Sequence, residues 1–298
     1  MKFANIEMVR DLGYTAASFD MAVSEDGKCL VSIGSYKPSV KIYDLVNLSL
    51  KVERHLEAEP LRVIPLAQDA SKICVLKRDR SLELHAKYGF HESIKMPSIC
   101  LDACFNKFKA EVMCAGVGPD VYRFNLEQGR FLKSQGTTIQ EILCICMCEA
   151  NGLICVGGDN KIQFIDQRSK EVFRTVDYSE TPFSMCFSSS GMELGVGTEE
   201  GSVYLHDLRA RKEICKVSHE GSVRKVGFNG KILVSIGGKA MKCIDRAGMI
   251  GEYAGDVGMS CFACAGGFMF IGFDNGEIRE VISEELGEIP MHLKMNEV

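Results

Sequence analysis

Three cysteines that alternate along one segment are the first residues whose type and spacing could do chemistry. Cys144, Cys146 and Cys148 would point to one face of a β-strand, and thiolates are good zinc ligands. Side chains two residues apart on a strand lie about 7 Å apart, however, which is too far for one tetrahedral ion. Cys261 and Cys264 form a lone Cys-x-x-Cys pair with no second pair nearby. We interpret both groups as core packing, and we expect no metal and no cofactor.

The motifs of the common enzyme classes are not matched. The six histidines show neither ligand spacing nor a dyad. Gly238-Lys239 is followed by Ala240, so it is no phosphate-binding loop, and Gly201 follows Gly195 and Gly197 one residue too late for a dinucleotide fingerprint. We therefore expect no enzymatic activity and no small-molecule substrate.

Clusters of basic residues at predicted turns are the next candidates for function. They lie at Lys77-Arg78 with Arg80, at Arg168 with Lys170, at Arg209 with Arg211-Lys212, and at Arg224-Lys225. One interpretation is solvated loop charge, and the other is contact with the phosphate backbone of a nucleic acid. The net charge of −5 gives the chain as a whole no attraction to nucleic acid or to anionic membrane. Local basic patches can still bind, because binding depends on where the charge lies, so both interpretations stay open.

The elements that must position these residues are repeated. A five-residue segment with apolar side chains at alternate positions, usually ending in a polar or acidic residue, recurs about every 40 residues. Its copies are 40–44, 81–85, 121–125, 162–166, 203–207, 241–245 and 278–282. A nearly continuous apolar strand precedes each copy, and turns rich in Gly and acidic residues separate the strands. The pattern predicts an all-β, WD-repeat-like, seven-bladed β-propeller with four-stranded antiparallel blades.

We expect one domain over residues 1–285, followed by a short tail over 286–298. The predicted blades are 18–55, 60–95, 99–133, 142–176, 182–217, 222–254 and 259–282. The last blade has no obvious fourth strand, and a terminal strand is expected to close the ring. The N-terminal segment Asn5–Arg10 is the favoured donor. The acidic tail Glu284–Val298 is the alternative, weakened by its charge and by Pro290.

An uncharged stretch of 17 residues, Val257–Phe273, is too short for a membrane span of about 20 residues. The pair Gly266-Gly267 fits a hairpin turn, so we expect two buried strands there and no membrane partner. Charged residues within Met1–Arg10 exclude a secretory signal at that position. The 14 cysteines are then expected to stay reduced, in the cytosol or the nucleus.

Two segments are more specific than strand packing requires. They are Ser35–Asp44, continuing through Leu48 to His55, and Val121–Leu132. Together they resemble the WD-repeat domain of the nucleolar protein 10 family, with a thinner likeness that covers about residues 5–245. Members of that family usually carry an N-terminal extension and a long charged C-terminal region, so the resemblance implies a compact form. The chain also contains no Trp, and other residues must fill the positions that give WD repeats their name.

The resemblance implies a non-catalytic scaffold in the biogenesis of the small ribosomal subunit. It implies a component of the small-subunit processome that is needed to process precursor rRNA toward 18S rRNA, in the nucleus and nucleolus. The implied partners are other processome proteins, with backbone contacts to precursor ribosomal RNA or small nucleolar RNA. A hypothesis from another class is a substrate receptor that binds a short peptide for a ligase or signalling complex. The expected contact residues are Tyr36, Lys37, Arg54, Arg123, Arg130 and Arg168.

Overall fold

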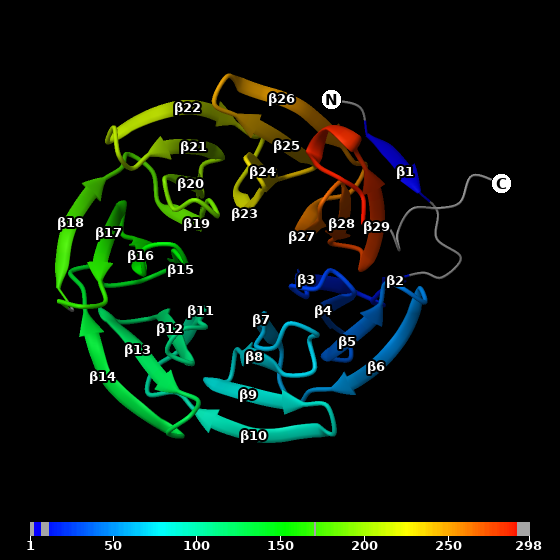
Figure 1. Cartoon of the computed structure of the whole chain (residues 1–298), viewed down its shortest axis with the longest axis horizontal. Coiled ribbons are helices and arrows are strands. Elements are labelled where there is room, and N and C mark those ends of the chain that lie inside the picture. Colours follow the sequence, from blue (N-terminus) through cyan, green and yellow to red (C-terminus); the bar gives the residue numbers. More distant parts are fainter. Residues whose placement is uncertain (1–2, 7–11, 170, 291–298) are drawn as a thin grey trace. The chain divides into compact units, whose positions relative to one another are not determined.

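The computed structural model describes residues 3–6, 12–169 and 171–290, and in these residues the regular structure is almost entirely β-strand (Figure 1). The strands form seven antiparallel sheets, each made of four consecutive strands or completed by an N-terminal strand. The fold class predicted from the repeat, a seven-bladed β-propeller with four-stranded blades, is confirmed. The chain divides into two compact units, residues 1–95 with 239–241 and 251–298, and residues 96–238 with 242–250.

The first unit contains the first, second and last blades. The first blade is β3 (Ala17–Val23), β4 (Cys29–Ser35), β5 (Ser39–Asp44) and β6 (Ser49–His55). The second blade is β7 (Pro60–Pro65), β8 (Ile73–Lys77), β9 (Ser81–Ala86) and β10 (Gly89–Lys95). The last blade is β27 (Met259–Ala265), β28 (Phe268–Phe273) and β29 (Glu277–Ile282), with β1 (Ala4–Ile6) and β2 (Leu12–Gly13) both paired to β29.

The second unit contains three complete blades and most of a fourth. The third blade is β11 (Cys100–Asn106), β12 (Glu111–Gly116), β13 (Asp120–Asn125) and β14 (Arg130–Gly136). The fourth blade is β15 (Cys144–Met147), β16 (Leu153–Gly158), β17 (Lys161–Asp166) and β18 (Val172–Asp177). The fifth is β19 (Pro182–Phe187), β20 (Glu193–Thr198), β21 (Ser202–Asp207) and β22 (Lys212–Ser218). The sixth is β23 (Val223–Asn229), β24 (Ile232–Gly237), β25 (Ala240–Asp245) and β26 (Gly248–Ala254).

The N-terminus supplies the missing strand of the last blade, as predicted. Ala4 pairs with Ile282 and Leu12 with Ile278, so β1 and β2 cover the same edge of β29 (Figure 1). Part of the predicted donor, residues 7–10, lies outside the described residues. The described part of the C-terminal tail forms only the 3-10 helix η1 (Glu284–Leu286). The pairing gives the outer edge of β29 hydrogen-bond partners that would otherwise have to come from water or another chain.

Each blade uses its second strand as its core. Strands β12, β20 and β28 are buried at every position, as expected for apolar runs covered on both faces. The fourth strands alternate between exposed and half-buried residues, as β18 does, because one of their faces meets water. The uncharged stretch near the C-terminus forms β27 and β28, joined by a turn at Gly266 with φ of 61°. Among the described residues, no helix is long and apolar enough to cross a membrane.

The acidic residue that ends the repeated segment shapes the turn that follows it. Asp207 Oδ1 accepts hydrogen bonds from the backbone amides of Arg209 at 2.8 Å and Ala210 at 3.0 Å. The Ala210 bond, followed by the Arg209 bond, lowers the pKa of the Asp207 carboxyl against the opposing effect of desolvation. Asp44 makes the same turn with Val46 and Asn47. The repeated Asp is therefore explained by local backbone geometry.

Two hydrogen bonds between side chains link the segment before a blade to the second strand of that blade. Tyr14 lies 3.0 Å from Ser32, and His219 Nε2 lies 2.9 Å from Ser235, in hydrogen bonds between side chains. Glycine is needed beside both, because a Cβ at Gly34 would lie 2.3 Å from the Tyr14 ring. A Cβ at Gly237 would lie 2.8 Å from His219.

Successive blades within each unit are joined by a side chain that accepts a backbone hydrogen bond. In the first unit, Asp20 of β3 accepts from the amide of Val63 in β7 at 3.2 Å. In the second unit, Asp102 of β11 accepts from Ile145 of β15 at 2.9 Å. These buried acceptors satisfy amides that a first strand would otherwise leave unpaired. Cys144, Cys146 and Cys148 pack in the apolar core between the fourth and fifth blades, in agreement with the packing interpretation.

Candidate partner-binding surface of the first two blades

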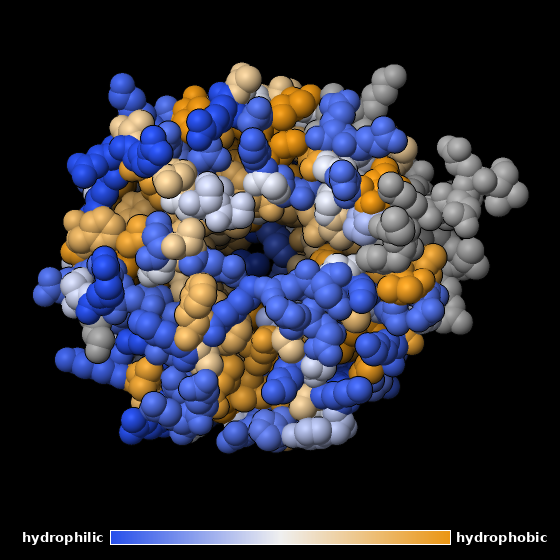
Figure 2. All heavy atoms as spheres, in the orientation of Figure 1, coloured by the Kyte–Doolittle hydropathy of each residue, from blue (hydrophilic) through white to orange (hydrophobic). Residues whose placement is uncertain are grey.

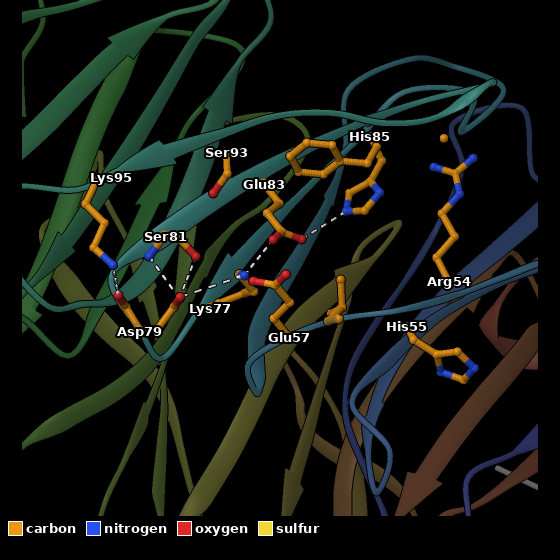
Figure 3. A pocket seen from close by; sticks show the side chains of 13 residues that line it. Arg54, His55, Glu57, Lys77, Asp79, Ser81, Glu83, His85, Ser93 and Lys95 are labelled. Atoms are coloured by element: carbon orange, nitrogen blue, oxygen red, sulfur yellow. Dashed lines mark hydrogen bonds and ion pairs between the residues drawn. The ribbon is translucent and has the colours of Figure 1, made fainter.

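A pocket of about 630 Å³ lies between the end of β6 and the face of the second blade (Figure 3). The first blade and its link to the second contribute Arg54 and Glu57, and β8, β9 and β10 contribute the other walls. All of these residues belong to the first unit. The pocket is unusual because it combines a buried charge network with an exposed aromatic ring.

The floor of the pocket holds the buried ion pair of Lys77 and Glu83, next to the exposed Asp79 and Lys95. Lys77 is 2% exposed at its side chain, and its Nζ lies 2.5 Å from Glu83 Oε1 and 3.8 Å from Asp79 Oδ2. Burial raises the pKa of Asp79, but the hydrogen bond from Ser81 and the charge of Lys77 outweigh it, so the pKa is lowered. Lys95 Nζ donates to the Asp79 carbonyl oxygen at 3.0 Å. Lys77, Glu83 and Asp79 therefore neutralise one another locally.

Arg54 lies on the wall of the pocket and is half-buried. Its Nη2 donates to the carbonyl oxygen of Ala86 at 2.9 Å and approaches that of Lys87 at 3.4 Å, at the turn between β9 and β10. Within the described part of the chain, Arg54 has no ion pair with a carboxylate. Burial lowers the pKa of its guanidinium, since lost hydration is not replaced by a counter-charge. The carbonyl bonds fix the position of the side chain and leave its charge uncompensated.

His85 and Phe90 form the remaining wall. His85 Nε2 lies 3.3 Å from Glu83 Oε2, and Nδ1, which points away from Glu83, has no hydrogen-bond partner (Figure 3). The Phe90 ring is 56% exposed and meets the imidazole edge-to-face at 6.1 Å between centroids. A buried polar atom without a partner is uncommon in a native fold, and it marks this wall as a place where a ligand could bond.

A second, smaller pocket of about 320 Å³ lies in the first blade around Tyr36, Lys37 and Lys41. Lys41 Nζ donates to the Gly13 carbonyl oxygen at 2.6 Å and lies 4.7 Å from the centroid of the Tyr14 ring. Tyr36 is 79% exposed, Lys37 is exposed, and both line this pocket. The structure therefore places Tyr36 and Lys37 together, and Arg54 beside the larger pocket, within one unit.

Arg123 requires a correction. It was expected to contact a partner, but it lies in β13 and is 5% exposed. Its Nη2 and Nε donate to the same oxygen of Glu111, at 2.6 and 3.0 Å. Its charge is buried and fully used inside the third blade, so it offers no surface for contact.

Arg130 and Arg168 lie at exposed turns of the second unit. Arg130 Nε donates to Gln128 Oε1 at 2.8 Å, and the Arg168 guanidinium lies 3.3 Å from Asp166 with 91% of its side chain exposed. The Arg168 amide and then its guanidinium lower the pKa of Asp166. Both arginines are accessible, and neither lines the two pockets of the first unit described above. Their role as contacts remains a prediction.

Sequence reasoning did not identify the network of Lys77, Glu83 and His85. Lys77 had been grouped with Arg78 as loop charge, but Lys77 is the buried last residue of β8. Arg78 is exposed and lies 2.9 Å from Glu59. A signal was present, because Glu83 and His85 are two residues apart on a predicted strand and so share one of its faces. A lysine ending an apolar run opposite such residues indicates a buried pair.

The surface of the chain is mixed in polarity. Figure 2 shows one face on which hydrophilic side chains prevail and apolar ones are scattered among them. Exposed aromatic residues occur singly, as at Phe108 and Phe173, or near the larger pocket, as at Tyr88 and Phe90. Scattered apolar residues are normal on a protein surface, so the pockets of the first unit are the more specific features.

Seven four-stranded antiparallel blades define a β-propeller. Residues 2–295 match the family described as "Nucleolar protein 10-like, N-terminal domain". The chain therefore belongs to the nucleolar protein 10-like family, and the resemblance seen in the sequence is confirmed.

Similar proteins are found in fungi and in vertebrates. Ribosome biogenesis protein ENP2 of Saccharomyces cerevisiae is 32% identical over 212 residues, which cover 68% of this chain and 30% of ENP2. Nucleolar protein 10 of Xenopus tropicalis is 31% identical, and that of Homo sapiens 30%, each over 72% of this chain and 33% of the relative. The matched region is thus about a third of each of these relatives.

Proposed function

We propose that this chain acts in ribosome biogenesis, as a non-catalytic scaffold of the small-subunit processome needed to process precursor rRNA toward 18S rRNA. The observation that carries the proposal is membership of the family, whose relatives bear the names ribosome biogenesis protein and nucleolar protein. The nucleus and nucleolus are the proposed location.

The fold supports a scaffolding role. Its buried charged groups, such as Arg123 with Glu111 and Lys77 with Glu83, are bound to each other inside single blades and stabilise them. Loops and pockets at the blade ends then remain for partner segments, which propellers can bind in surface grooves. The proposed partners are other processome proteins. Contact with precursor ribosomal RNA or small nucleolar RNA is proposed to be limited to backbone phosphates.

The test is depletion of the protein in cells that express it, followed by a blot of precursor rRNA. We expect precursors of 18S rRNA to accumulate while precursors of the large subunit mature normally. Rescue with the intact chain should restore processing, and a Tyr36→Ala, Lys37→Ala, Arg54→Gln variant should restore it less well. The matched control is Arg78→Gln, at an exposed cation already paired with Glu59. Normal 18S maturation after depletion contradicts the proposal and favours the substrate-receptor hypothesis.

A further inference from the structure

The pocket beside Arg54 has a specific imbalance. Lys77 is paired with the carboxylates of Glu83 and Asp79, whereas Lys95 and Arg54 are bonded to backbone carbonyl oxygens. Lys95 is exposed and keeps its hydration, but Arg54 is half-buried. A carbonyl dipole does not neutralise a guanidinium, and charges that lose hydration are normally paired with an opposite charge. The pocket therefore lacks one negative charge at the position of Arg54.

No carboxylate of the pocket supplies that charge. Glu57 is exposed and lies apart from Arg54 in Figure 3, and no ion pair joins the two. Glu83 faces Lys77 and His85. The guanidinium is held in place by the Ala86 and Lys87 carbonyls, so it is ordered before any ligand arrives. Such preorganisation reduces the entropic cost of binding.

The other wall of the pocket is apolar. Phe90 is exposed to the cavity beside His85, and Leu56 also contributes to the lining. An apolar side chain next to the anion would cover Phe90 and remove both from water. His85 Nδ1, buried and without a partner, can bond to a polar group that enters deeper.

We infer that this pocket binds an acidic side chain, Asp or Glu, that lies next to an apolar residue in a segment of another protein. A carboxylate matches the planar fork of a guanidinium in two parallel hydrogen bonds. A nucleic acid backbone fits less well. Arg54, Lys77 and Lys95 line the pocket together with Glu57, Asp79 and Glu83, so a chain of phosphates would meet as many negative as positive groups. The inference goes beyond the proposed function, because it concerns binding by the purified chain alone.

The experiment is an NMR titration of the ¹⁵N-labelled full chain, following the Nε–Hε signal of Arg54. The probe is N-acetyl-Phe-Glu-amide, and its neutral isostere N-acetyl-Phe-Gln-amide is the matched control. We expect a saturable shift with the Glu probe at millimolar concentration and binding at least about tenfold weaker with the Gln probe, because one charge-assisted pair is lost.

Variants locate the site. Arg54→Gln should weaken binding of the Glu probe at least about tenfold, Phe90→Ala should weaken it several-fold, and Arg78→Gln should leave it unchanged. Thermal unfolding of each variant shows that it is folded. Equal binding of both probes, or full binding by Arg54→Gln, overturns the inference. So does a shift of the Arg54 signal by an oligoadenylate when the Glu probe gives none. Because no ribosomal precursor is present, this test can fail while the depletion test succeeds, or the reverse.

Discussion

Arg54 and Arg123 were both expected to contact a partner, but only Arg123 is paired with a buried carboxylate in the structure. Arg123 lies on the third strand of its blade and gives two hydrogen bonds to a buried carboxylate of the neighbouring strand. Arg54 lies on a fourth strand, beside a pocket, and meets only carbonyl oxygens. A cation with a buried counter-charge stabilises its own blade. A cation held in position without one remains available to a partner.

The largest effect on stability is expected from breaking the buried ion pair of Arg123 and Glu111. Arg123→Leu leaves Glu111 buried without its partner, and we expect a loss of about 3–5 kcal/mol in the free energy of unfolding. Urea unfolding measures the change. Arg130→Leu, at an exposed turn, is the matched control and should change stability by less than about 0.5 kcal/mol. Equal effects of the two substitutions would show that Arg123 is not structural.

A smaller loss is expected at the floor of the pocket. Lys77→Met removes the ammonium 2.5 Å from Glu83, and we expect a loss of about 2–3 kcal/mol, because the pocket lets water approach the carboxylate left behind. Lys95→Met, which removes a bond to a backbone carbonyl, is the control. If Lys77→Met is as stable as the wild type, the ion pair of Lys77 and Glu83 does not stabilise the blade. Lys77 would then not differ from Arg54 in its contribution to stability.

His206 is a third case, a half-buried side chain whose charged form is disfavoured. Burial, with a further contribution from the charge of Arg174, lowers its pKa to about 4, and its Nε2 is hydrogen-bonded to the Tyr178 hydroxyl at 2.5 Å. Between pH 6.5 and 4 the unfolded chain binds a proton that the folded chain does not, so stability falls as pH falls. We expect a loss of about 2 kcal/mol between pH 7 and 5 from this residue.

The measurement is urea unfolding at both pH values for the wild type and His206→Phe. The variant should lose less stability on acidification than the wild type, and His91→Gln, at an exposed histidine, should behave like the wild type. Identical pH dependence of wild type and His206→Phe would be incompatible with a lowered pKa.

The smallest effect on stability is expected at Arg54. Arg54→Gln loses bonds to two carbonyls but also relieves a desolvated charge, so the free energy of unfolding should change by about 1 kcal/mol or less. Differential scanning calorimetry measures the change against Arg168→Ala, which should be neutral. A loss as large as that of Arg123→Leu would place Arg54 among the structural cations and remove the contrast.

Part of the site could be predicted and part could not. The turn after β4 was identified from an unusual local sequence, and Tyr36 and Lys37 are exposed there at a pocket. The prediction that Arg123 contacts a partner was wrong because the neighbouring residues, Tyr122 and Phe124, do not indicate that Glu111 pairs with the guanidinium. Glu111 comes twelve residues earlier, at the start of β12, and only the register of β12 against β13 brings its carboxylate to the guanidinium.

The sequence by itself determined the blades, because alternating and continuous apolar runs at a regular spacing can be buried only as repeated strands. It also determined the turns, since Asp207 and Asp44 bond to amides two or three residues away. The tertiary structure decided which charges are paired. Lys77 meets Glu83 across the β8–β9 hairpin, and Arg54 meets the carbonyl of Ala86, 32 residues away in the next blade. Charge pairing depends on a few ångströms between side chains, and strand register and blade packing set those distances.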